Sequence, residues 1–520
     1  MVAQYKEQCS GAFGNRPVAV RTFKTTARLM NIQQASSNIR PSPVASGPRH
    51  ALSRPILHAG TARAVTAGVT RFPILVLILG LAGCAGTGTR LLDAYPDLQP
   101  GQTTWERWSQ RARSSRDTAA DSSLPASLSE LVAMALDRNP GVRAAWHAWQ
   151  GRIDAVAPAG ILPNPRLTYT WMAQPVETRV GPNEHRMSVT QPIPSPPRLI
   201  AQHRRAVARS VVGRFGYEAA VVNAIADLKS SVGQLRFLQR ALVITAKNEA
   251  LAAELAGAAA TRAVQDRGLL FDVNKARSQL AQLQYDRVRY DELLLAARAR
   301  LNALLDRSPS AEIPQFDAWP QSPLPESLEA LYARALAHDP RLKQWDARIQ
   351  AGQAGVSDAN GRFFPNLSIS LQYLVNGEAA MEGVADSGKD AIGLMVGLEV
   401  PIWFGADAGR VGSAESELAT RVEGKRAHVN KLLADVQSVL YRLRNAVRLV
   451  ALYDGTLLPE AHKAMADAEA WYREGAGGFT DFLEARAAWN RFELARERAD
   501  ADRVSAEAAL ERLLGQALTP

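Results

Sequence analysis

The feature that most constrains the fold is that the chain repeats itself. The segment SLSELVAMALDRNP, which starts at Ser127, recurs as SLEALYARALAHDP from Ser327. Each copy begins a helix at its serine and ends that helix before Pro140 or Pro340, because proline pushes the preceding residue out of the helical region. A repeat of this length predicts a tandem architecture, in which one structural unit is written twice.

Each copy continues with two short alternating segments and then two long helical ones. The segments ILPNPRLTYTWM and FFPNLSISLQYL correspond to each other, and a second alternating run follows each of them. Sixty helical residues span on the order of 90 Å, far more than the girth of a compact domain. We therefore expect a mainly α fold with the unit helix-strand-strand-long helix-long helix in a first repeat, residues 127–315, and a second repeat, residues 316–520. The long helical segments are expected at residues 199–258 and 409–474, with return partners at 271–306 and 481–514.

The four alternating segments predict strands with one apolar and one polar face. Each run has about eight to eleven residues, the length of a tilted strand that crosses a bilayer. Apolar-out alternation with polar-in is the pattern of a transmembrane β-barrel with a wet lumen. The polar positions expected to face that lumen are Ser368, Ser370, Gln372 and Glu399. The alternative is a pair of ordinary surface hairpins with one face buried.

Four strands are too few for a barrel that encloses water, since the smallest such barrels use about eight. Open strand edges are not tolerated in lipid either. The membrane interpretation therefore requires several chains to pool their strands, and three chains would supply twelve. Without such an oligomer the surface-hairpin alternative holds.

The most apolar run of the chain, residues 72–83, has the layout of a secretory signal. Arg63 and Arg71 precede it, and it ends in small residues. It is shorter than the roughly 20 apolar residues that a membrane span requires. The ending Leu-Ala-Gly-Cys resembles the lipobox of bacterial lipoproteins, which implies that Cys84 is acylated and begins the mature chain, with residues 84–126 as a lipidated arm. The alternative is a plain signal peptide with a bystander cysteine.

Residues 1–71 are rich in Ser, Pro, Arg and Ala and have no hydrophobic periodicity, so we expect a disordered leader. Because export signals usually lie near the start codon, we expect translation to begin near Val65 or Val69, with a transit or regulatory tail as the alternative. Ten Lys and Arg against one acid place +9 of the net charge of +10 in this leader. The basic balance therefore gives no argument for a nucleic-acid partner.

Two further segments correspond between the repeats, RGLLFDVNKARSQL from Arg267 and GGFTDFLEARAAW from Gly477. Both carry a glycine, at least one apolar residue, an aspartate and then Ala-Arg. Glycine permits the positive φ that ends a helix, and aspartate complements the dipole at the start of the next one. These turns, with the duplicated strand pairs and long helices, resemble the TolC-like outer membrane efflux family over about residues 128–515. The turn residues that carry the resemblance are Gly268, Asp272 and Gly478.

The resemblance implies a homotrimer, with a trimeric α-barrel in the periplasm and a twelve-stranded β-barrel, four strands from each chain, in outer membrane lipid. It implies that substrate arrives from an inner membrane pump of the RND type through a periplasmic adaptor, a membrane fusion protein. It implies no enzyme activity and no cofactor. Asp481 and Glu484 match two acids that ring the periplasmic entrance in this family, so they are the expected gate, while the first repeat has Lys275 at the position of Glu484.

No catalytic or metal-binding constellation is evident in the sequence, whose histidines are dispersed and which lacks a Walker loop. The strongest rival is a lipid-anchored periplasmic coiled-coil adaptor or scaffold without a channel, which leaves the alternating strands unexplained. An enzyme on a helical scaffold is a weaker rival. The segment SVTQPIPSPPRL resembles one found in heavy-metal efflux members, although Pro197-Arg198 replaces its Gly-Lys. We therefore expect heavy-metal cations as substrate, with drugs or solvents as open alternatives.

Overall fold

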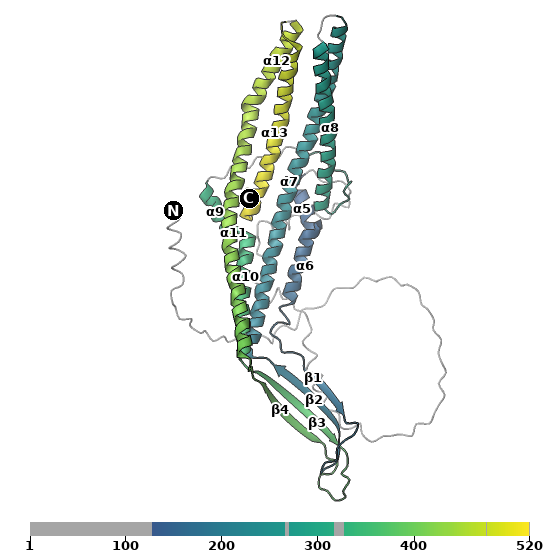
Figure 1. The fold of residues 1–520 in the computed structure, drawn as a ribbon, viewed down its shortest axis with the longest axis vertical. Coiled ribbons are helices and arrows are strands. Elements are labelled where there is room, and N and C mark those ends of the chain that lie inside the picture. Colours follow the sequence, from purple (N-terminus) through teal and green to yellow (C-terminus); the bar gives the residue numbers. More distant parts are fainter. Residues whose placement is uncertain (1–126, 266–269, 317–326, 475, 519–520) are drawn as a thin grey trace, which may run out of the picture. The chain divides into compact units, whose positions relative to one another are not determined.

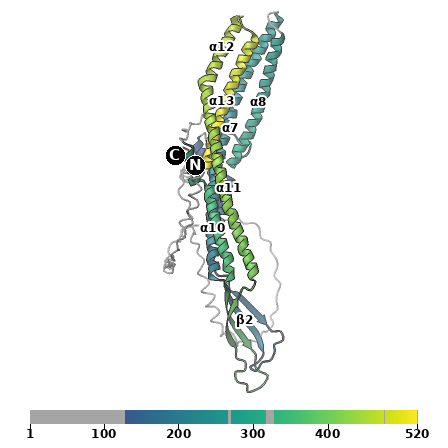
Figure 2. The same cartoon turned by 60° about the vertical axis from the view of Figure 1, so that its left-hand side comes forward.

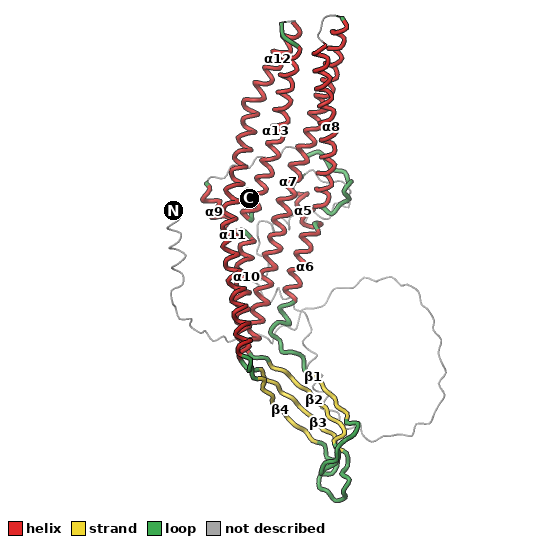
Figure 3. Tube along the Cα trace, in the orientation of Figure 1, coloured by secondary structure: helices red, strands yellow, loops and turns green. Residues whose placement is uncertain are grey.

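The computed structural model describes residues 127–265, 270–316, 327–474 and 476–518, and within them one order of elements occurs twice (Figure 1). The first set is α5 (Leu128–Arg138), α6 (Pro140–Asp154), β1 (Arg166–Trp171), β2 (Asn183–Ile193), α7 (Pro196–Val264) and α8 (Leu270–Leu304). The second set is α9 (Leu328–His338), α10 (Pro340–Asn360), η4 (Gly361–Phe363), β3 (Asn366–Asn376), β4 (Ala391–Glu399), α11 (Phe404–Leu452), η5 (Tyr453–Leu457), α12 (Leu458–Glu474) and α13 (Phe479–Leu514). The predicted mainly α fold with four strands is confirmed, with two short helices rather than one before each strand pair (Figure 3).

The helix boundaries predicted before Pro140 and Pro340 are confirmed. Asn139 and Asp339 lie between the two short helices of their repeats and cap the second one. The Asn139 side chain accepts a hydrogen bond from the backbone N–H of Val142, and Asp339 accepts one from that of Arg341. Proline at the first helical position costs nothing there, because its missing N–H would have no partner within the helix.

The four strands form one antiparallel sheet in the order β1-β2-β3-β4. Directly opposite residues share a face of the sheet. Leu371 lies opposite Val189 and Leu394, whereas Ser370 lies opposite Thr190 and Met395. The register therefore gathers most of the large apolar side chains on one face and places Ser368, Ser370, Gln372 and Glu399 together on the other, which also carries Met395.

Each repeat has its own helical core. In the first, Leu131 of α5 packs with Leu228 and Leu235 of α7 and Leu301 of α8. In the second, the same layer is built from α9, α11 and α13, with the buried residues Leu331, Val436, Leu440 and Leu510. The short helices thus serve the same purpose in both repeats, which is to cover the apolar stripe of a long helix. None of the described helices is long and apolar enough to cross a membrane.

The long helix expected at residues 409–474 is not continuous, which corrects that prediction. A π-helical turn, η5, separates α11 from α12. Pro459 follows it closely, and a proline removes one helical hydrogen bond and clashes with the carbonyl four residues earlier, here that of Gly455. In the first repeat the position that corresponds to Pro459 is Ala250, inside the uninterrupted α7. A bidentate pair between Arg496 of α13 and Asp454, at 2.9 and 3.1 Å, holds the broken turn.

A row of buried charges joins α7 to α13, and we call it the ionic seam: Lys229, Arg236, Glu497, Asp500, Arg503, Glu507 and Glu511. Arg503 is 2% exposed and binds Asp500 at 3.0 Å and Glu507 at 2.7 Å. Burial raises the pKa of Glu507, and the nearby Arg503 opposes that rise. Burial alone would also raise the pKa of Asp500, but Arg503 and Arg236 hold it below its ordinary value. The two pKa values shift in opposite directions, so the charge of each of these carboxylates depends on the basic side chains beside it.

We expect Arg503→Ala to destabilise the protein by roughly 3–5 kcal/mol, because it leaves buried carboxylates without their partner. Arg426, which pairs with Glu423 on the exposed surface of α11, provides the matched control. Arg426→Ala should change the stability by less than about 0.5 kcal/mol, as expected for exposed pairs. Thermal or denaturant unfolding of the two variants measures both values, and equal effects would show that the ionic seam does not hold α13.

Candidate functional site

The two helical hairpins, α7–α8 and α12–α13, have their turns at the same end of the described structure (Figures 1 and 2). We call these turns the hairpin tips. Phe479 and Leu483 of α13 pack there with Val273 and Ala276 of α8. The Tyr472 ring stacks on Phe482 and lies under the guanidinium of Arg262, 4.4 Å from its carbon. The tips of the two repeats therefore form one joint apolar cluster.

Of the predicted turn residues, Gly268 lies outside the described residues, and Gly478 does not play the expected backbone role. Gly478 has an ordinary φ of −74° and sits at the start of α13, so it does not use the left-handed region. A Cβ atom on it would lie 3.0 Å from a carboxylate oxygen of Asp481. The glycine thus leaves room for the Asp481 side chain. Asp272, in the first turn of α8, accepts a hydrogen bond from the Thr480 hydroxyl at 3.4 Å.

The two predicted gate acids, Asp481 and Glu484, have different surroundings in the structure. Glu484 binds Lys275 of the first repeat, with 2.7 Å between Nζ and Oε1. The hydrogen bond and charge of Lys275 lower the pKa of Glu484, so this pairing is lost only as the pH falls through the lowered value. Asp481 is exposed, and its carboxylate makes no ion pair with any other described residue. Lys275 and Glu484 occupy corresponding positions in the two repeats, so one ion pair links the two hairpin tips.

The arginine of the turn motif in the second repeat reaches across to the first repeat. Arg486 donates to the side-chain oxygen of Asn248 on α7 at 3.2 Å, and Asn248 in turn donates to Asn490. Burial lowers the pKa of Arg486. Its guanidinium also lies 5.6 Å from the ring centre of Trp489. The recurrence of Ala-Arg in both repeats identified the motif, but the contact with Asn248 could not be inferred from that recurrence.

The polar face of the sheet is closely packed at its centre. Ser370 is only 4% exposed, and its hydroxyl lies 2.9 Å from that of Thr190 on the neighbouring strand. Ser368 approaches Gly397 so closely that a Cβ atom there would lie 2.5 Å from the serine oxygen. Glu399 is exposed and accepts a hydrogen bond from Asn366 at 3.1 Å. Cross-strand bonds thus occupy several of the predicted lumen residues.

Within the ranges that the structure describes, no group of three or more histidine, cysteine or acidic side chains could hold a metal ion. Cys84, the predicted lipidation site, lies outside those ranges. The structural candidates for function are therefore the hairpin tips and the two-faced sheet.

Comparison with known proteins agrees with this arrangement. Residues 331–516 match the family model of the outer membrane efflux protein. Protein CyaE of Bordetella pertussis is 27% identical over 208 residues, which is 38% of this chain and 42% of CyaE. The chain thus spans about two-fifths of the length of this curated relative.

Solved structures share the fold over a larger part of the chain. A membrane protein from Pseudomonas aeruginosa superposes with a TM-score of 0.65 at 18% identity, covering 75% of this chain and 90% of that one. The outer-membrane channel OprN superposes with a TM-score of 0.62 at 21% identity, and the match covers 76% of this chain and 91% of the OprN chain. Residues 331–516 therefore match the outer membrane efflux protein family, and the chain shares its fold with these solved membrane protein and outer-membrane channel structures.

Proposed function

We propose that this protein is the outer membrane channel of a tripartite efflux system and that it works as a homotrimer. The observation that carries the proposal is the sheet, whose apolar face is left uncovered in the single chain. Leu394, Ile392 and Leu167 are 68–73% exposed, and Trp171 is 65% exposed. Apolar side chains in such number on one sheet face fit lipid better than water.

The sheet has two open edges, β1 and β4, and open edges are not stable in a bilayer. Three copies would join edge to edge into twelve strands, with the apolar faces outward and Ser368, Ser370, Gln372 and Glu399 facing the lumen. A lipid-anchored coiled-coil adaptor or scaffold, the second candidate, would have no use for such a face. The exposed apolar sheet therefore favours the channel.

In this proposal the hairpin tips point into the periplasm and meet a periplasmic adaptor, which connects them to an inner membrane pump of the RND type. Asp481 of three copies would line the entrance, next to the three Lys275–Glu484 pairs. A ring of exposed carboxylates attracts cations, which supports heavy-metal cations as the substrate class. Cys84 would carry the lipid that anchors the chain to the outer membrane.

The strand faces should differ in their tolerance of charge. Val396→Arg places a charge against lipid and should cost roughly 2–4 kcal/mol near the bilayer midplane. Gln372→Arg is the matched change on the polar face, because a Cβ atom on Gly393, directly opposite, would meet no other atom within 4 Å. Ser370 is unsuitable for this comparison, since its burial against Thr190 leaves no room for arginine.

The measurement is the yield of heat-sensitive trimer in outer membrane extracts. Val396→Arg should lose most of the trimer, while Gln372→Arg should retain it. Equal loss in both variants would show that the alternation does not serve a barrel.

Because Glu484 is paired with Lys275 whereas Asp481 has no ion pair with any described residue, we expect substitutions at Asp481 and Lys275 to change cation block in opposite directions. A multivalent cation added to the periplasmic side of a channel in a planar bilayer should block the current. Asp481→Asn should raise the half-blocking concentration several-fold, because that carboxylate is unpaired. Lys275→Gln should lower it, because it releases the Glu484 carboxylate.

Glu460→Gln, on the exposed surface of α12 away from the tips, is the control for this experiment. Its block should equal that of the unchanged protein. If Asp481→Asn leaves the block unchanged, the entrance ring lies elsewhere.

The lipid anchor has a direct test. Mass spectrometry of protein purified from outer membrane should find residues 1–83 removed and diacylglycerol attached to Cys84. Cys84→Ser should abolish the modification and move the protein out of the lipid-modified fraction. A mature chain that still carries the leader would exclude the anchor.

A further inference from the structure

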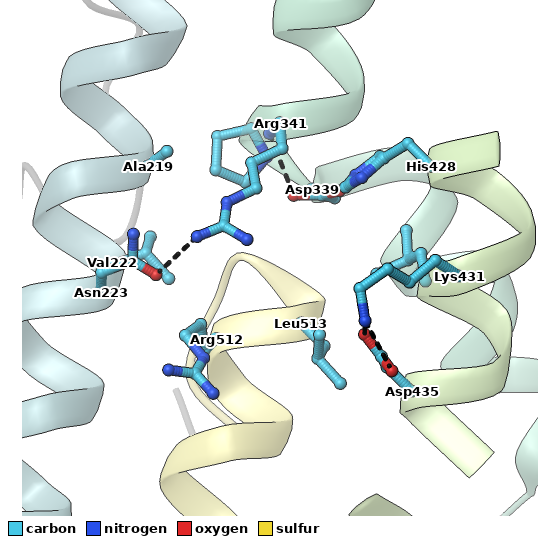
Figure 4. A pocket seen from close by; sticks show the side chains of 12 residues that line it. Ala219, Val222, Asn223, Asp339, Arg341, His428, Lys431, Asp435, Arg512 and Leu513 are labelled. Carbon is cyan, nitrogen blue, oxygen red and sulfur yellow. Dashed lines mark hydrogen bonds and ion pairs between the residues drawn. The ribbon is translucent and has the colours of Figure 1, made fainter. Parts of the chain in front are cut away.

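A cavity of about 70 Å³ lies where four helices of the two repeats meet (Figure 4). Its wall comes from α7, from the corner between α9 and α10, from α11 and from the end of α13. Charged side chains of the second repeat dominate it: Asp339, Arg341, His428, Lys431, Asp435 and Arg512. The cavity is well away from the residues assigned to the channel.

The first repeat builds the same corner without these charges. Counting from the matched pair Asp272 and Asp481, the positions of His428, Lys431, Asp435 and Arg512 correspond to Ala219, Val222, Ala226 and Ala303. The correspondence holds in the backbone, because Asp306 and Gly515, which match in the same way, both have a positive φ. The fold therefore does not require the charges of the second repeat, and they call for another explanation.

Most of the charges around the cavity already have partners. One Asp339 oxygen caps α10, and the other lies 2.6 Å from Nε2 of His428. Lys431 of α11 binds Asp435 of the same helix at 2.9 Å (Figure 4). These two pairs close the side of the cavity formed by α11.

Arg341 and Arg512, on the other side of the cavity, have fewer and longer polar contacts. Within the described residues, the Arg341 guanidinium makes one hydrogen bond, of 3.4 Å, to the neutral amide of Asn223. The Arg512 guanidinium is 3.8 Å from Asp227. Both side chains extend toward α7 on the same side of the cavity (Figure 4). Each guanidinium carries five N–H donors, so Asn223 and Asp227 occupy only a small part of the donors of this pair among the described residues.

We infer that this cavity binds a small oxyanion, phosphate or a simple carboxylate, between Arg341 and Arg512. The planar fork of arginine matches the oxygens of either group, and two forks from different helices can hold one anion from two directions. One water molecule needs about 10–15 Å³ of a cavity volume of this kind, so about 70 Å³ has room for an anion of a few heavy atoms. The bound anion joins α10 and α13 next to Asn223 of α7, and so connects the two repeats.

The test is calorimetric titration of the full protein, purified in detergent, with inorganic phosphate and separately with acetate, at constant ionic strength set with chloride. Binding should saturate at one anion per chain. Arg341→Gln/Arg512→Gln should weaken it at least tenfold, and a phosphate-dependent rise in the unfolding temperature should disappear with it. The two probes separate a phosphoryl ligand from a carboxylate.

Arg442→Gln is the matched control, since Arg442 is exposed on α11 and does not line the cavity. It should bind the anion as the unchanged protein does. Both cavity arginines are exposed, so the double variant is expected to fold, and circular dichroism checks this. An absence of saturable binding for both anions, or equal affinity in the double variant and the unchanged protein, would overturn the inference.

Discussion

The contact between α7 and α13 is the constraint on which the rest of the structure depends. It joins the first repeat to the second, and its ionic seam buries Arg503 between two carboxylates. Buried ion pairs contribute little net stability, but a buried charge without its partner costs several kcal/mol. A slide of α13 by one turn would separate Arg236 and Lys229 of α7 from their partners on α13, so the seam favours a single register. That register decides which residues meet at the far end of the helices, including Lys275 and Glu484.

Duplication supplies a common frame, and the features with proposed functions lie where the two copies differ. α7 runs unbroken, while its counterpart is interrupted by η5 before Pro459. At the tips, Lys275 of one repeat faces Glu484 of the other, so the difference between the copies is what creates the ion pair. At the inner corner, a neutral wall in one repeat is matched by a charged cavity in the other. The specific contacts described above therefore form at positions where the two repeats carry different residues.

What the sequence could predict was local. The prolines at Pro140 and Pro340 mark helix boundaries through their own backbone chemistry, and strand alternation has a period that any single strand displays. The π turn at η5 was missed because the helical pattern continues across it, although Gly455 and Pro459 were visible. The pairs of the ionic seam that connect α7 to α13, and the Lys275–Glu484 pair, join residues more than 200 positions apart. Such pairs depend on the register between helices, which periodicity alone does not determine.

The sheet sets a final requirement that one chain does not meet by itself. Its apolar face exposes large side chains, and each Å² of apolar surface left in water forgoes roughly 25 cal/mol. Its edges, β1 and β4, also leave backbone donors and acceptors without strand partners. Lipid would cover the face but would make the open edges more costly, since no water remains to bond them. Closing the edges with further copies removes that cost, so in the proposed channel strand pairing between chains and entry into the bilayer have to occur together.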